Sequence, residues 1–94
     1  MISAIVLIYP ASGEINREVP DAAQAIARIR SAYEATAVSI DETDGVSLEF
    51  EDWRFNLRAS NTEPVIRLNI ESRGNVALMK EKVAEVLALI DGLP

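Results

Sequence analysis

The stretch that decides the fold is Val46-Ser-Leu-Glu-Phe-Glu-Asp-Trp-Arg-Phe-Asn-Leu-Arg-Ala-Ser-Asn-Thr-Glu-Pro-Val-Ile-Arg-Leu-Asn-Ile70. Apolar and polar residues alternate along it, with breaks at 51–52 and 60–64. Alternation of this kind predicts strands with one apolar and one polar face, joined by short turns. We therefore expect an antiparallel meander that is covered on one side only.

The register of the second hairpin follows from its side chains if it closes symmetrically about Thr62 and Glu63. Each apolar residue then faces an apolar one, and the arginine at its start has an acid on either side. The expected pairs are Phe55 with Ile70, Leu57 with Leu68, Asn56 with Asn69, and Arg54 with both Glu71 and Glu49.

The same register places Arg58 directly opposite Arg67 on the polar face, where like charges destabilise a strand pair. No acid faces either residue in this register. The adjoining Ser60-Asn-Thr62 adds hydroxyls and an amide, and Asn61 tolerates the left-handed backbone that lets N–H groups converge. Two interpretations stay open: a site for a tetrahedral oxyanion, or a surface loop whose arginines are solvated or bound by Glu63.

One helix is expected before the meander in the sequence and one after it. Asp21 has the pattern of an N-cap before an amphipathic helix of about three turns, and Asn75 caps a second helix that ends at Gly92. Short alternating stretches at 14–19 and 36–40 add strands. The expected fold class is α+β, an antiparallel sheet of four to five strands with two helices on one face.

Composition narrows the possible functions. The 94 residues fit a single domain, 1–94, and the formal net charge of −6 argues against nucleic acid or an anionic membrane as partners. The absence of Cys and His excludes disulfides and Ser-His-Asp catalysis, and the lack of Cys fits a cytoplasmic protein. Residues 1–8 are apolar but too few to cross a bilayer, and we interpret them as a strand or the remnant of a helix.

The run from Asp44 to Glu71 resembles the C-terminal domain of bacterial phosphomannomutases, in the phosphohexomutase (phosphoglucomutase/phosphomannomutase) superfamily. Within it, Arg58-Ala-Ser-Asn-Thr-Glu-Pro64 resembles that family's phosphate-binding loop. Tyr9-Pro-Ala-Ser-Gly-Glu-Ile-Asn16 and Glu71-Ser-Arg-Gly74 extend the resemblance to about residues 9–90, while residues 1–8 form an atypical leader.

The resemblance implies a role in binding. In these enzymes a phosphoserine on another domain exchanges its phosphoryl group with the sugar phosphate, and the C-terminal domain grips the phosphate that is not being transferred. The implied phosphate-binding residues are Arg58, Ser60, Asn61, Thr62 and Arg67. Glu63 is expected to point away and tie the loop down, and Pro64 to restrict its exit.

The resemblance also implies what this chain lacks. Nothing matches the family's Ser-His-Asn-Pro nucleophile or its metal-binding Asp-Gly-Asp-Gly-Asp run, and a hairpin turn explains Asp41-Glu-Thr-Asp-Gly45 better than a metal site does. The chain alone is therefore expected to hold no catalytic residue and no metal, although Mg²⁺ is implied for the full-length enzyme. The implied partners are a hexose phosphate (mannose or glucose 1- or 6-phosphate) and the other mutase domains. The alternative is a stand-alone sugar-phosphate-binding or interaction module.

Overall fold

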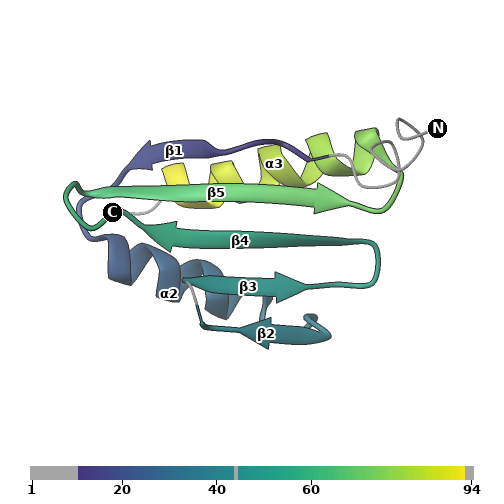
Figure 1. The fold of residues 1–94 in the computed structure, drawn as a ribbon, viewed down its shortest axis with the longest axis horizontal. Helices are drawn as coiled ribbons and strands as arrows, with labels where there is room; N and C mark the ends of the chain where they lie inside the picture. The colour runs from purple at the N-terminus through teal and green to yellow at the C-terminus, as the bar shows by residue number, and fades with distance from the viewer. Residues whose placement is uncertain (1–10, 44, 93–94) are drawn as a thin grey trace.

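The computed structural model describes residues 11–43 and 45–92. Its elements are β1 (Ile15–Glu18), α2 (Ala22–Tyr33), β2 (Ser39–Asp41), β3 (Val46–Glu49), β4 (Trp53–Ala59), β5 (Val65–Ser72) and α3 (Val76–Asp91). The five strands form one antiparallel sheet in the order β1-β5-β4-β3-β2 (Figure 1). The α+β prediction is confirmed, and the leader at 1–8 lies outside the described residues.

The predicted register of the central hairpins is confirmed in full. Arg54 lies opposite Glu71 on one side and Glu49 on the other, and its Nη2 is 2.7 Å from Glu71 Oε1. Beyond β5 the sheet continues with β1, which places Asn16 opposite Arg67. The sequence pattern did not predict this pairing, and it matters for the candidate site.

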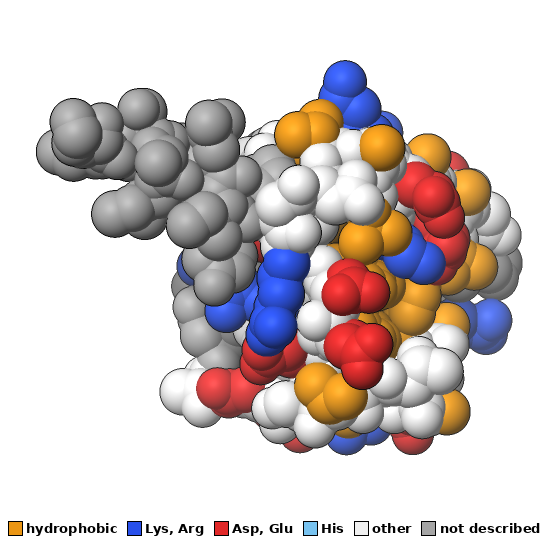
Figure 2. Space-filling view, turned by 90° about the vertical axis from the view of Figure 1, so that its right-hand side faces the viewer, with side chains coloured by type: hydrophobic (Ala, Val, Ile, Leu, Met, Phe, Trp, Pro, Cys, Tyr) orange, Lys and Arg blue, Asp and Glu red, His pale blue; other side chains and the backbone are white. Residues whose placement is uncertain are grey.

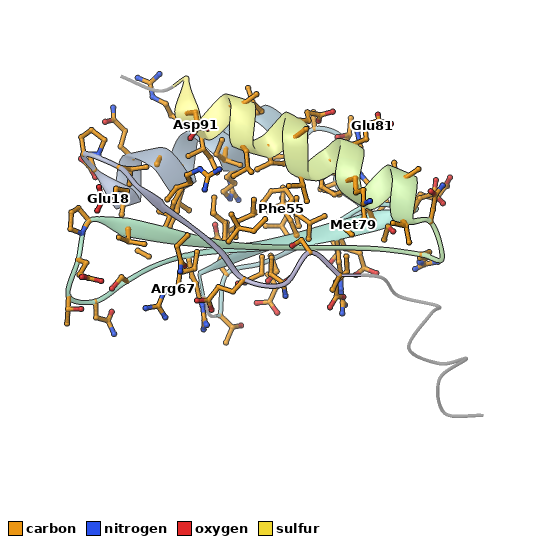
Figure 3. The ribbon with its side chains drawn as sticks, turned by 90° about the horizontal axis from the view of Figure 1, so that it is seen from above. Glu18, Phe55, Arg67, Met79, Glu81 and Asp91 are labelled. Carbon is orange, nitrogen blue, oxygen red and sulfur yellow. The ribbon has the colours of Figure 1, made fainter. Side chains whose placement is uncertain are left out.

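The core fills one face of the sheet. α2 contacts β3, β4 and β5, while α3 contacts β5. Figure 3 shows Phe55 between the sheet and α3, with Arg67 on the opposite side of the sheet. Rings of four aromatic residues meet in this core, namely Tyr33, Phe50, Trp53 and Phe55. On the other face, polar residues of β3, β4 and β5 alternate with the buried ones and are exposed or half-buried.

The strand predicted at 36–40 is present, but it is shorter and begins later. β2 spans only residues 39–41 at the sheet edge, where Val38 is 70% exposed and Ile40 is 37% exposed. The helices pack on the inner strands, so the apolar side of this edge strand receives less cover. Alternation predicts the strand correctly, but it cannot say how far the helices extend over the sheet.

The predicted helix ends are confirmed. Asp21 Oδ1 accepts a hydrogen bond from Gln24 N at 3.1 Å, and Asn75 Oδ1 accepts one from Leu78 N at 2.9 Å. Gly92 is the C-cap of α3 with φ −86°, a right-handed conformation. Neither helix in the described part of the chain is long and apolar enough to cross a membrane.

A hydrogen bond between the two helices makes stability depend on pH. The Tyr33 hydroxyl donates to Glu85 Oε2 at 2.5 Å. This bond, aided by Lys82, lowers the pKa of Glu85, while burial and then the bond itself raise the pKa of Tyr33 above its usual range. Because the pKa of Glu85 is lower in the folded than in the unfolded protein, its carboxylate stabilises the fold at pH values above the unfolded-state pKa. This stabilisation is lost as pH falls through the folded-state pKa. A raised tyrosine pKa stabilises the fold below about pH 10, and this stabilisation is lost at higher pH.

We therefore predict that Tyr33→Phe lowers the free energy of unfolding by about 1–2 kcal/mol at neutral pH. The difference from the wild type should shrink as pH falls through the lowered pKa of Glu85 and its carboxylate takes up a proton. Urea denaturation followed by circular dichroism at several pH values measures both effects. A difference that stays constant through the whole acid range in which both proteins remain folded would show that the charge of Glu85 contributes nothing to it.

Candidate anion-binding site

Two arginines face each other across the central hairpin. Arg58 on β4 pairs with Arg67 on β5, as the register predicted. Their side chains are 42% and 40% exposed, and they lie on the polar face because the residues that alternate with them, such as Leu57 and Leu68, are buried in the core. Figure 3 shows Arg67 projecting from the side of the sheet that the helices leave open. The structure thus places two positive charges next to each other beside the 60–64 loop.

Backbone hydrogen bonds close this loop. The Ser60 N–H donates to the Val65 carbonyl at 2.9 Å, and the Val65 N–H donates to the Glu63 carbonyl at 2.8 Å. The Pro64 carbonyl accepts from Val19 N–H at 2.8 Å, which ties the loop to the chain that follows β1. Glu63 therefore holds the loop through its main-chain carbonyl, and its side chain is exposed. These bonds set the spacing of the two arginines and the loop side chains.

The tip of the loop differs from expectation at Asn61. No non-glycine residue among residues 11–43 and 45–92 has a positive φ, so Asn61 does not take the left-handed conformation. A bond from Thr62 N to Ser60 Oγ, at 3.3 Å, shapes the tip instead. Asn61 and Thr62 are exposed there and Ser60 is half-buried. The loop brings the five predicted phosphate-binding residues to one end of the hairpin, but without a left-handed cradle of N–H groups.

Sequence reasoning missed one member of the site. Glu14, just before β1, places Oε1 at 3.8 Å from Arg58 Nη2 and Oε2 at 4.0 Å from Arg67 Nε. The sequence offered Glu63 as a partner for the arginines only in the alternative of a plain surface loop. Glu14 and Asn16 lie two residues apart in extended chain and so share a face. That spacing would have revealed Glu14 if the pairing of β1 with β5 had been known.

The turn between β2 and β3 supports Arg58 from the other side. Gly45 has φ +71°, and a Cβ built there would lie 2.6 Å from both Arg58 Cβ and the Leu57 carbonyl oxygen. Only glycine allows the turn to lie this close to β4. Within the same acidic stretch, Asp41 Oδ1 accepts a hydrogen bond from Thr43 N at 2.8 Å, as in a turn. Asp44 lies outside the described residues.

The opposite end of the polar face also carries charges, but they pair with each other. A hollow there is lined by Glu49, Arg54, Glu71 and Arg73, among others. Arg54 binds Glu71, and Arg73 Nη2 lies 3.8 Å from Glu49 Oε2. Figure 2 views the molecule from this end and shows acidic and basic side chains next to one another. The two arginines that face each other lie at the other end of this face, beside the 60–64 loop.

Comparison with known proteins decides the family. The family model described as "Phosphoglucomutase/phosphomannomutase, C-terminal domain" matches residues 14–89. The chain belongs to this family. The match includes both arginines, the 60–64 loop and Glu14.

Individual relatives agree with this assignment. The chain is 63% identical over 82 residues to a phosphomannomutase of Escherichia coli, covering 87% of this chain and 18% of that protein. It is 46% identical over 92 residues to a protein of Xanthomonas campestris named "Phosphohexose mutases", covering 98% of this chain and 20% of the relative. The chain thus spans about a fifth of the length of these relatives.

A solved structure shares the fold. The crystal structure of a phosphoglucomutase/phosphomannomutase family protein from Burkholderia thailandensis aligns with a TM-score of 0.63 and 22% identity. The alignment covers 88% of this chain and 18% of that one.

Proposed function

We propose that this domain holds the phosphate group that is not being transferred while a phosphomannomutase or phosphoglucomutase interconverts hexose 6-phosphate and hexose 1-phosphate. The observation that carries the proposal is Arg58 facing Arg67 beside a loop of short polar side chains. In this proposal Arg58, Ser60, Asn61, Thr62 and Arg67 bind the phosphate, and Glu63 and Pro64 support the loop.

Charge explains why these residues suit a phosphate. Two like charges on facing strand positions destabilise the hairpin, and a dianion between them removes that cost. Each guanidinium offers a planar fork of donors, and each charge-assisted bond contributes about 1.5–3 kcal/mol. Since the whole chain has a net charge of −6, attraction of an anion must be local to this site.

The chemistry itself is assigned to other parts of the enzyme. In residues 11–43 and 45–92, no three side chains of His, Cys, Asp or Glu converge as metal ligands. We propose that this domain contributes binding and orientation, the nucleophile and metal belong to other domains, and the full-length enzyme is cytoplasmic.

An amide chemical-shift titration with mannose 1-phosphate tests the proposal, with chloride at matched ionic strength as control. We expect saturable shifts confined to residues 58–67 and 14–16. The dissociation constant of the isolated domain should be roughly millimolar, about 4 kcal/mol, because sugar contacts from other domains are missing. Shifts that are absent, or that chloride reproduces, would contradict phosphate binding by this domain.

A further inference from the structure

Glu14 stands between the two arginines of the proposed phosphate site. It lies two residues before Asn16, which pairs with Arg67 across β1 and β5. Residues two apart in an extended chain share a face, so Glu14 lies on the open polar face with the arginines. Each carboxylate oxygen approaches a different guanidinium, and the Glu14 side chain is 50% exposed.

The contacts are those of a loose ion pair. The separations of 3.8 Å and 4.0 Å are too long for hydrogen bonds. Arg67 Nε is buried and has no hydrogen-bond acceptor within the described part of the chain. Glu14 thus offsets charge without accepting a hydrogen bond from Arg67 Nε.

From this geometry we infer that Glu14 is a resident counter-ion that competes with phosphate for Arg58 and Arg67. A carboxylate carries one negative charge, whereas a phosphate dianion carries two and presents oxygens to both guanidinium forks. The two anions repel each other, so binding of phosphate requires Glu14 to give way. This inference rests on the proposed function and adds a residue that sets the affinity of the same site.

Glu14→Gln is the informative substitution, because it removes the charge and keeps the size of the side chain. A carboxylate about 6–8 Å from a bound dianion opposes it even in water. We therefore expect Glu14→Gln to bind inorganic phosphate about five- to tenfold more tightly than the wild type at low ionic strength. The gain should fall below about twofold at roughly 0.5 M salt, where screening is strong.

Glu81→Gln is the matched control. Glu81 is exposed on α3, and Figure 3 shows it on the side of the molecule away from Arg67. Both substitutions change the net charge by one, so a general charge effect would appear in both. Titration with inorganic phosphate at about pH 8, where it is a dianion, should leave Glu81→Gln within about twofold of the wild type.

Arginine Nε–Hε signals provide a readout that needs no ligand. The Arg67 signal should shift in Glu14→Gln and stay in place in Glu81→Gln. Wild-type binding with equal or weaker binding by Glu14→Gln would overturn the competition while leaving the proposed function intact. If the wild type, Glu14→Gln and Glu81→Gln all fail to bind phosphate, both the competition and the proposed function are overturned. Thermal unfolding checks that each variant folds, and Glu14→Ala should repeat the gain if loss of the charge is its cause.

Discussion

Replacing Arg58 with alanine is expected to abolish detectable phosphate binding by the isolated domain while leaving the fold intact. Loss of one charge-assisted contact, about 1.5–3 kcal/mol, weakens binding by about 10- to 150-fold. Because the dissociation constant of the wild-type domain is expected to be roughly millimolar, that of the variant should be too high to measure. The fold should survive because the Arg58 side chain is 42% exposed on the face opposite the core. Amide shifts during titration and far-ultraviolet circular dichroism measure the two effects.

Arg54→Ala controls for the loss of one positive charge from the same strand. The Arg54 side chain is 62% exposed and pairs with Glu71 at the far end of the polar face. Its replacement should change phosphate affinity by no more than about twofold, through the general field alone. An unfolded Arg58→Ala protein, or one that binds as the wild type does, would contradict the role assigned to Arg58.

The sequence predicted the central hairpins because their partners are neighbours along the chain. A short turn leaves few possible registers, and a slip of one residue would bury Arg54 and expose Phe55. The acids on either side of Arg54 exclude the remaining alternatives. The facing arginines follow from the same register, which is why the centre of the candidate site could be predicted without a structure.

Pairing between distant segments could not be predicted in this way. β1 and β5 are joined by about half of the chain, and the four residues of β1 fit an edge position beside more than one strand. Glu14 owes its place near the arginines to this pairing. Glu63 is adjacent to them in sequence and was considered as their partner only in the alternative of a plain surface loop, whereas Glu14 lies within 4.0 Å of both arginines.

The loop tip shows a second limit. Asn61 tolerates a left-handed backbone, and composition alone makes that conformation reasonable. The structure closes the loop through Ser60, Val65 and Thr62 instead, and these bonds are satisfied with φ negative at Asn61. Residue preferences state what a position permits, and the network of hydrogen bonds around it selects among the permitted conformations.

Phe55→Ala is expected to lower the free energy of unfolding by about 3–5 kcal/mol, a larger loss of stability than Tyr33→Phe or any of the surface substitutions should cause. Phe55 is 2% exposed, and its ring centroid lies 5.5 Å from that of Tyr33 and 5.7 Å from that of Trp53. Its removal leaves a cavity between the sheet and both helices. The total free energy of unfolding of a domain of this size is about 5–15 kcal/mol, so this substitution should remove a large part of it. Urea denaturation followed by far-ultraviolet circular dichroism measures it.

Val38→Ala is the control, since Val38 is 70% exposed and its truncation should change stability by no more than about 0.5 kcal/mol. Phe55 and Arg58 lie on the same strand but on opposite faces, so Phe55→Ala should reduce stability and Arg58→Ala should reduce phosphate binding. Phe55→Ala should lose phosphate binding only in proportion to the unfolded fraction, and Arg58→Ala should lose it while folded. A folded Phe55→Ala protein that cannot bind phosphate would show that core packing, in addition to the loop, sets the spacing of the two arginines.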